Sequence, residues 1–105
     1  MKDLLGNELK PGDFLVIPSY GNELKVTVAS RILESNVIVI HFDELESATA
    51  TERFAHAKAS GHCLEAWRSL FEHKKAPEKI VKVTLPPHEL IRYNKLLKKF
   101  AIKFT

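Results

Sequence analysis

Residues 13–42 read DFLVIPSYGNELKVTVASRILESNVIVIHF, a stretch with three apolar runs separated by turn-forming residues. The runs cover residues 14–17, 24–33 and 37–42 and are rich in the β-branched and aromatic side chains that favour strands. Pro18 ends the first run because proline has no N–H to donate to a neighbouring strand. Residues 19–22 and 34–36 have the length and composition of hairpin turns. The stretch therefore predicts an antiparallel meander.

The second and third runs predict strands in different environments. Val26, Val28, Ser30 and Ile32 alternate along the second run, so we expect them to share one face of the sheet. The third run is apolar on both faces, which is typical of a central strand that is covered above and below.

Residues after the meander predict a helical segment over 50–74, because the apolar period changes to that of a helix. Thr49 and Glu52 have the spacing of a capping box, and Ser60-Gly61 predicts a kink or two short helices. Asp43-Glu44 favours the start of the coming helix by its charge. One apolar stripe is expected to cover the sheet: Leu64, Trp67, Leu70 and Phe71.

The last third of the chain predicts one more strand and one more helix. Residues 79–85 return to the alternating pattern, and Pro87 suits the first turn of a helix. We expect that helix to run from His88 to about Phe104. Its predicted apolar side contains Leu90, Ile91, Leu97, Phe100 and Phe104.

Composition predicts a globular protein of the cytoplasm. Hydrophobic residues make up 45% of the chain and charged residues 28%, the usual mixture of a folded domain. The one cysteine, Cys63, cannot form an internal disulfide and fits a reducing compartment. No apolar run has the length of a signal peptide or a membrane span, so we expect no membrane partner.

Positive charge is concentrated in the C-terminal third. Residues 74–105 contain nine Lys or Arg and two Glu, within a chain whose net charge is +3. On the predicted last helix, the spacing places a group of cations along one stripe. That stripe could be a solvated face, could contact an acidic protein, or could bind the phosphates of a nucleic acid. Its members are Arg92, Lys95, Lys98, Lys99 and Lys103.

Catalytic and metal-binding motifs are not found in the sequence. The five histidines and Cys63 lack the paired spacing of a structural zinc site, and Cys63 falls in a run with the character of core. The chain has no glycine-rich phosphate loop and no hydrolase motif. We therefore predict no catalytic residue, no metal and no cofactor. Tyr20, in a predicted hairpin loop, is a candidate contact residue.

The opening of the chain, DLLGNELKPGDFLV at residues 3–16, resembles the openings of many small bacteriophage-encoded proteins. Those openings read Asp-x-x-Gly-Asn-x-apolar-Lys-x-Gly-Asp and lead into an SH3-like small barrel. Residues 79–83 resemble a later strand of such proteins. The resemblance implies a phage accessory protein in the host cytoplasm, a class whose members often bind and inhibit a host protein. It carries over no functional residues.

Together these observations predict an α+β fold, in which a bent, SH3-like antiparallel sheet of four to five strands carries a helical insertion and a C-terminal amphipathic helix. We expect one domain over 1–105, with the meander in 1–46, the helical insertion in 47–76, and the strand plus basic helix in 77–105.

The predicted function is a non-enzymatic binding module for a host protein with an acidic surface, with contacts through Tyr20 and the basic helix. Two alternatives remain open. One is a nucleic-acid-binding protein that uses the basic helix. The other is a small nuclease or nucleotide-cleaving enzyme with His56, His62 or His73 as acid and base.

Overall fold

The structure is a computed structural model that describes residues 1–18, 24–61 and 64–104. Five strands form one antiparallel sheet in the order β4-β3-β2-β1-β5. The strands are β1 (Phe14–Pro18), β2 (Leu24–Ile32), β3 (Val37–His41), β4 (Glu72–Lys75) and β5 (Val81–Lys82). The helices are α1 (Phe42–Leu45), α2 (Ala48–Ala59), α3 (Leu64–Ser69) and α4 (Pro87–Lys99), and a 3-10 turn, η1 (Pro77–Lys79), separates β4 from β5.

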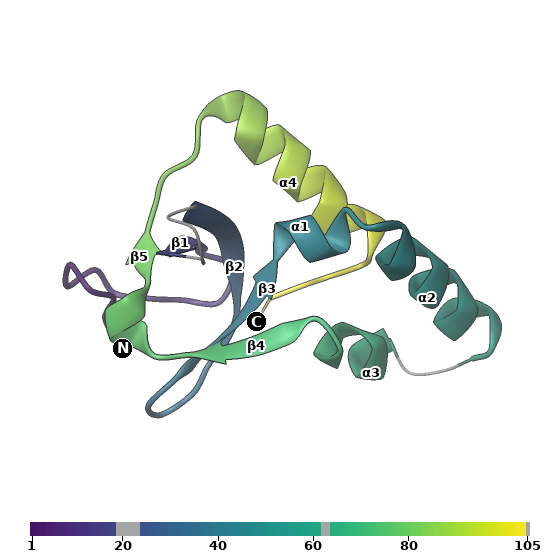
Figure 1. Ribbon diagram of the computed structural model, residues 1–105, viewed down its shortest axis with the longest axis horizontal. Coiled ribbons are helices and arrows are strands. Elements are labelled where there is room, and N and C mark those ends of the chain that lie inside the picture. The colour runs from purple at the N-terminus through teal and green to yellow at the C-terminus, as the bar shows by residue number, and fades with distance from the viewer. Residues whose placement is uncertain (19–23, 62–63, 105) are drawn as a thin grey trace.

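This architecture confirms the predicted α+β fold, with a helical segment inserted after the third strand and a helix at the C-terminus. The sheet is not closed: β4 and β5 form its two edges. Figure 1 shows α4 above the sheet, α1 at the end of β3, and α2 with α3 on the side opposite to the N-terminal loop.

Two apolar clusters lie on opposite faces of the sheet. The helix-facing cluster joins Val28 and Ile40 of the sheet to Phe42, Trp67 and Phe100. The other cluster contains Leu9, Leu15, Ile17, Ala29, Val37, Val39 and Ile80. Residues Val37–Ile40 are buried on both faces, so the central position predicted for the third strand is confirmed.

A β-bulge in β2 changes the faces predicted for its residues. The pairing register between β2 and β3 shifts between Ala29 and Arg31, which leaves Ser30 as the extra residue. Val28 therefore packs on the helix side, whereas Ile32 packs in the opposite cluster. The expectation that both share one face is wrong, because strict alternation holds only where the ladder is regular.

The helical segment is shorter than predicted at its C-terminal end. α2 begins at Ala48, and its N-cap is Ser47, whose Oγ accepts the N–H of Ala50 at 3.2 Å, so the predicted Thr49 cap is wrong. The predicted break is confirmed, since α2 ends at Ala59. Residues 72–75, expected to be helical, form β4 instead. They pair with β3, so the backbone N–H and C=O groups along the second edge of that buried strand have hydrogen-bond partners.

The predicted fourth strand over 79–85 is reduced to the short β5, because residues 77–79 form the 3-10 turn and residues 83–86 lie outside the ladder. The predicted helix over 88–104 ends at Lys99. Its buried stripe is Tyr93, Leu97 and Phe100, whereas Leu90 and Ile91 are 37% and 58% exposed. Placing Leu90 and Ile91 on the core side was therefore wrong.

α4 ends in a Schellman motif formed without glycine. Ile102 N–H donates to the Leu97 carbonyl at 2.9 Å and Ala101 N–H donates to the Lys98 carbonyl at 3.1 Å. Ala101 has φ of +53°, a left-handed conformation that glycine adopts without strain. Ile102 and Leu97 are both buried, which is the apolar contact usual for this motif.

We expect Ala101→Gly to stabilise the fold by about 1 kcal/mol, because glycine removes the Cβ strain of the left-handed position. The midpoint temperature of thermal unfolding should then rise by roughly 5 °C. Ala55→Gly, at an exposed site inside α2, is the matched control and should lower stability by about 1 kcal/mol. A destabilised Ala101→Gly protein would contradict this interpretation of the α4 terminus.

The N-terminal loop is held to β5 by one buried carboxylate. Asp3 is 6% exposed and accepts from the N–H groups of Leu5 (2.9 Å), Asn7 (2.8 Å) and Lys82 (2.7 Å), and from Asn7 Nδ2 (3.1 Å). Burial would raise the pKa of Asp3, but these hydrogen bonds outweigh it and hold the pKa below its ordinary value. Gly6 supplies a φ of +86° in the same turn.

Asp3→Ala should destabilise the protein by about 2 kcal/mol, because it leaves backbone donors of the loop and of β5 without their acceptor. Asp3→Asn, which keeps one carbonyl acceptor, should lose less. Chemical denaturation of the parent protein and the two variants measures the free energy of unfolding of each. Equal stability of Asp3→Ala and the parent would show that the loop does not depend on this carboxylate.

Candidate functional site

α1 and its C-cap residue, Glu46, bring three acidic side chains close together, and each pairs with a basic residue from a different element. Asp43 bonds to Lys25 of β2, and Glu44 Oε1 lies 2.8 Å from Nε2 of His73 on β4. Glu46 accepts from Arg92 of α4, with both carboxylate oxygens 2.7 Å from NH2. The acidic residues after the third strand therefore connect the sheet to α4, in addition to the helix-start role predicted for them.

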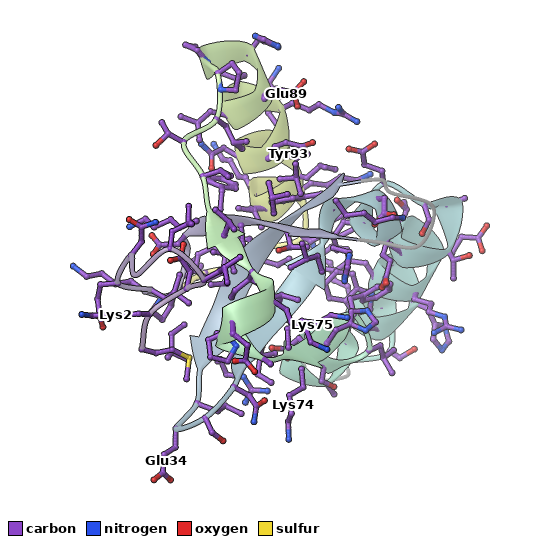
Figure 2. The ribbon with its side chains drawn as sticks, turned by 60° about the vertical axis from the view of Figure 1, so that its left-hand side comes forward. Lys2, Glu34, Lys74, Lys75, Glu89 and Tyr93 are labelled. Carbon is purple, nitrogen blue, oxygen red and sulfur yellow. The ribbon has the colours of Figure 1, made fainter. Side chains whose placement is uncertain are left out.

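A groove of about 440 Å³ lies beside α4, and we call it the α4 groove. Two contacts hold α4 in place beside the α1 region and so position the groove. Arg92 pairs with Glu46, and the Tyr93 ring stacks on Phe42 with centroids 4.3 Å apart. Figure 2 shows Glu89 and Tyr93 as parts of α4. The groove is lined by Glu46, His88, Ile91, Arg92, Lys95, Leu96 and Lys99.

The predicted basic stripe is only partly formed. Arg92, Lys95 and Lys99 line the α4 groove, as one stripe on a helix requires. Lys98 is exposed but does not line that groove. Lys103 lies beyond the end of the helix, and its backbone carbonyl accepts from Arg68 NH1 at 2.8 Å. Including Lys103 in a helical stripe was wrong, because the Schellman motif ends the helix before it.

The cations in the α4 groove differ in how far their charge is compensated. Arg92 is bound by both oxygens of Glu46, which raises the pKa of Arg92 above its ordinary value. Lys99 donates to Thr51 Oγ1 at 3.1 Å and lies 5.1 Å from the centre of the Phe100 ring. Thr51 and the ring carry no charge, and neither Lys95 nor Lys99 forms an ion pair among the described residues.

Exposed apolar side chains lie among these cations. Ile91 is 58% exposed and Leu96 is half-buried, and both line the groove. The sequence prediction missed them as site residues because it assigned Ile91 to the core. The arrangement suits a partner that presents carboxylates next to an apolar side chain.

Tyr20 lies outside the described residues, so the structure gives no position for this candidate. Trp67 and Tyr93 are 4% and 8% exposed and belong to the core.

A second cluster of titratable groups lies where β3, β4 and α1 meet. The rings of His41 and His73 meet edge to face, with centroids 4.9 Å apart, and His73 also contacts Glu44. His56 lines a different groove, between α2 and α3, and His62 and Cys63 lie outside the described residues. His73 is thus brought to His41, which the acid–base prediction did not include.

No group of three or more potential metal ligands is found within residues 1–18, 24–61 and 64–104. Over the same ranges, none of the helices has the length and apolar character needed to cross a bilayer.

Comparison with family models, with curated proteins and with solved structures gave no match to this chain. The resemblance to phage accessory proteins therefore stays a prediction, and the function is argued from the geometry.

The His41–His73 contact predicts a pH dependence of stability. Partial burial, and then the charge of His73, lower the pKa of His41 below its ordinary value of 6.5, although Glu44 and Asp43 oppose the shift and Lys75 adds to it. Below pH 6.5 the unfolded chain takes up a proton that folded His41 resists. Stability should therefore be full above that pH and fall as the pH decreases toward the lowered pKa.

The His41→Gln variant should lose less stability than the parent protein as the pH is lowered. The measurement is the change in the free energy of unfolding between pH 8 and pH 5. His88→Gln is the control, because the His88 side chain is 79% exposed. If both variants keep the pH slope of the parent protein, His41 is not its source.

Proposed function

We propose that this protein is a non-enzymatic binding module that engages an acidic segment of a partner protein through the α4 groove. In keeping with the resemblance of its opening, the partner is a bacterial host protein whose activity is modulated by a phage-type accessory protein. The contact is formed by Lys95 and Lys99 with Ile91 and Leu96, and Arg92 sets the shape of the groove.

One observation carries the proposal: the exposed Ile91 lines the same groove as Lys95 and Lys99, two cations that form no ion pair among the described residues. An exposed isoleucine costs a protein little by itself. In a groove with Lys95 and Lys99 it forms the mixed apolar and charged surface that is usual for a transient protein interface.

The same groove is a poorer fit to a nucleic acid. Glu46 lines it, and Glu89 lies 3.8 Å from Arg92 NH1, so carboxylates accompany the cations. Phosphates would be repelled by those carboxylates, and Ile91 offers no flat surface on which a base can stack. A protein partner can place its acidic and apolar side chains to match.

Alanine at both Lys95 and Lys99 should weaken partner binding by about tenfold and leave the melting temperature nearly unchanged, because both side chains are exposed. The measurement is affinity capture of the tagged protein from nuclease-treated bacterial lysate, followed by mass spectrometry and then by titration with the purified partner. The matched control is Lys2→Ala with Lys74→Ala, which removes the same charge at exposed sites away from α4 (Figure 2).

Loss of binding in the control pair as well would mean that net charge, not the α4 groove, is responsible. Retention of binding by the Lys95/Lys99 variant would remove the groove from the interface. Nucleic acid retained from untreated lysate, with binding that falls steeply with salt, would support the nucleic-acid alternative instead.

A further inference from the structure

A second groove, of about 760 Å³, lies between α2 and α3 and shares no lining residue with the α4 groove. We call it the α2–α3 groove. Its volume is in the range of ligand sites, about 300–1,000 Å³. Its apolar wall consists of Ala57, Ala66, Trp67 and Leu70, and its charged rim of Glu52, Arg53 and His56.

Trp67 in that wall has a polar group with no partner. The side chain is 4% exposed, and its indole N–H has no acceptor, the single such case among buried side-chain polar atoms of the described residues. The ring centroids of Phe54, Phe71 and Phe100 lie 5.0–5.1 Å from the Trp67 ring centroid, so the indole is packed among aromatic rings. A buried donor left unpaired costs about 1–3 kcal/mol.

The rim contributes a cation. Arg53 makes no ion pair among the described residues, although several acidic side chains lie on neighbouring elements. His56 lies one helical turn further along α2, and Glu52 is the carboxylate among the described residues of the rim. An incoming anion would therefore be favoured on the Arg53 side of the rim.

We propose that the α2–α3 groove binds a small amphiphilic carboxylate, with an aliphatic or aromatic body against Ala57, Ala66, Trp67 and Leu70 and its head group at the rim near Arg53. The indole N–H is buried in this structure, so it serves as a reporter of packing against the Trp67 ring and is not a contact of the head group. This site is separate from the α4 groove and does not rest on the proposed protein partner.

Decanoate, at concentrations below its micelle limit, is the probe, and Trp67 is the reporter because it is the only tryptophan in the chain. We expect a saturable change in tryptophan emission and a shift of the indole N–H resonance in a ¹H–¹⁵N spectrum. 1-Decanol, which keeps the apolar body without the charge, should bind at least threefold more weakly.

Two variants test the assignment in the full-length protein. Ala66→Phe places a ring in the groove at an exposed helix position and should weaken decanoate binding at least tenfold. Arg53→Gln should weaken it by about threefold to fivefold, the range of an exposed ion pair. Lys74→Gln, which removes the same charge at an exposed site that lines neither groove, should bind decanoate like the parent protein.

An indole N–H resonance that does not move up to the micelle limit would overturn the proposal. Equal affinity of the parent and Ala66→Phe would overturn it too, because the fatty acid would then be bound elsewhere. Equal affinity of the parent and Arg53→Gln would overturn the choice of a carboxylate. None of these results would bear on partner binding by the Lys95/Lys99 variant.

Discussion

The arrangement of this protein depends on the direct passage of β3 into α1. β3 is buried on both faces, and α1 begins at the next residue, so the strand fixes where the short helix lies. Phe42 and Leu45 of α1 are almost fully buried, and the Phe42 ring stacks on Tyr93 of α4. The apolar contacts supply most of the stabilisation, because aromatic side chains bury large areas. The carboxylates of Asp43, Glu44 and the C-cap residue Glu46 set the orientation of α1 against its neighbours, since exposed ion pairs contribute little energy each.

A second junction holds α3 and the C-terminal tail to the sheet. The bulge in β2 leaves Ser30, which is 3% exposed, between Glu72 and Arg68. Ser30 Oγ donates to Glu72 Oε2 at 2.7 Å and accepts from Arg68 NH2 at 2.6 Å. Arg68 also lies over the Phe104 ring, 5.3 Å from its centre. Because every group in this network has a partner, the bulge connects the elements at little cost in unsatisfied polar atoms.

The sequence predicted the positions of the structural elements correctly where one physical signal dominated. The three strands of the meander, the break after α2 and the position of Lys95 and Lys99 on one side of a helix all follow from periodicity, turn residues and glycine. β4 was missed because Glu72-His73-Lys74-Lys75 has the composition of a solvated edge, and it is a strand only because β3 needs a partner. The end of α4 was missed because an alanine, not a glycine, adopts the left-handed position.

The candidate surface was harder to predict than the fold, and the reason is specific to α4. Counting apolar residues at helical spacing assigns Leu90 and Ile91 to the core, but Tyr93, Leu97 and Phe100 already fill that side. When a helix carries more apolar side chains than its buried face can hold, the remaining ones are exposed to solvent or to a partner. Here the exposed part lies beside Lys95 and Lys99, in a groove held in shape by Arg92 and Glu46. The surface proposed for binding is thus the part of α4 that is not buried in the core, and its positive charge is the reason for proposing an acidic partner.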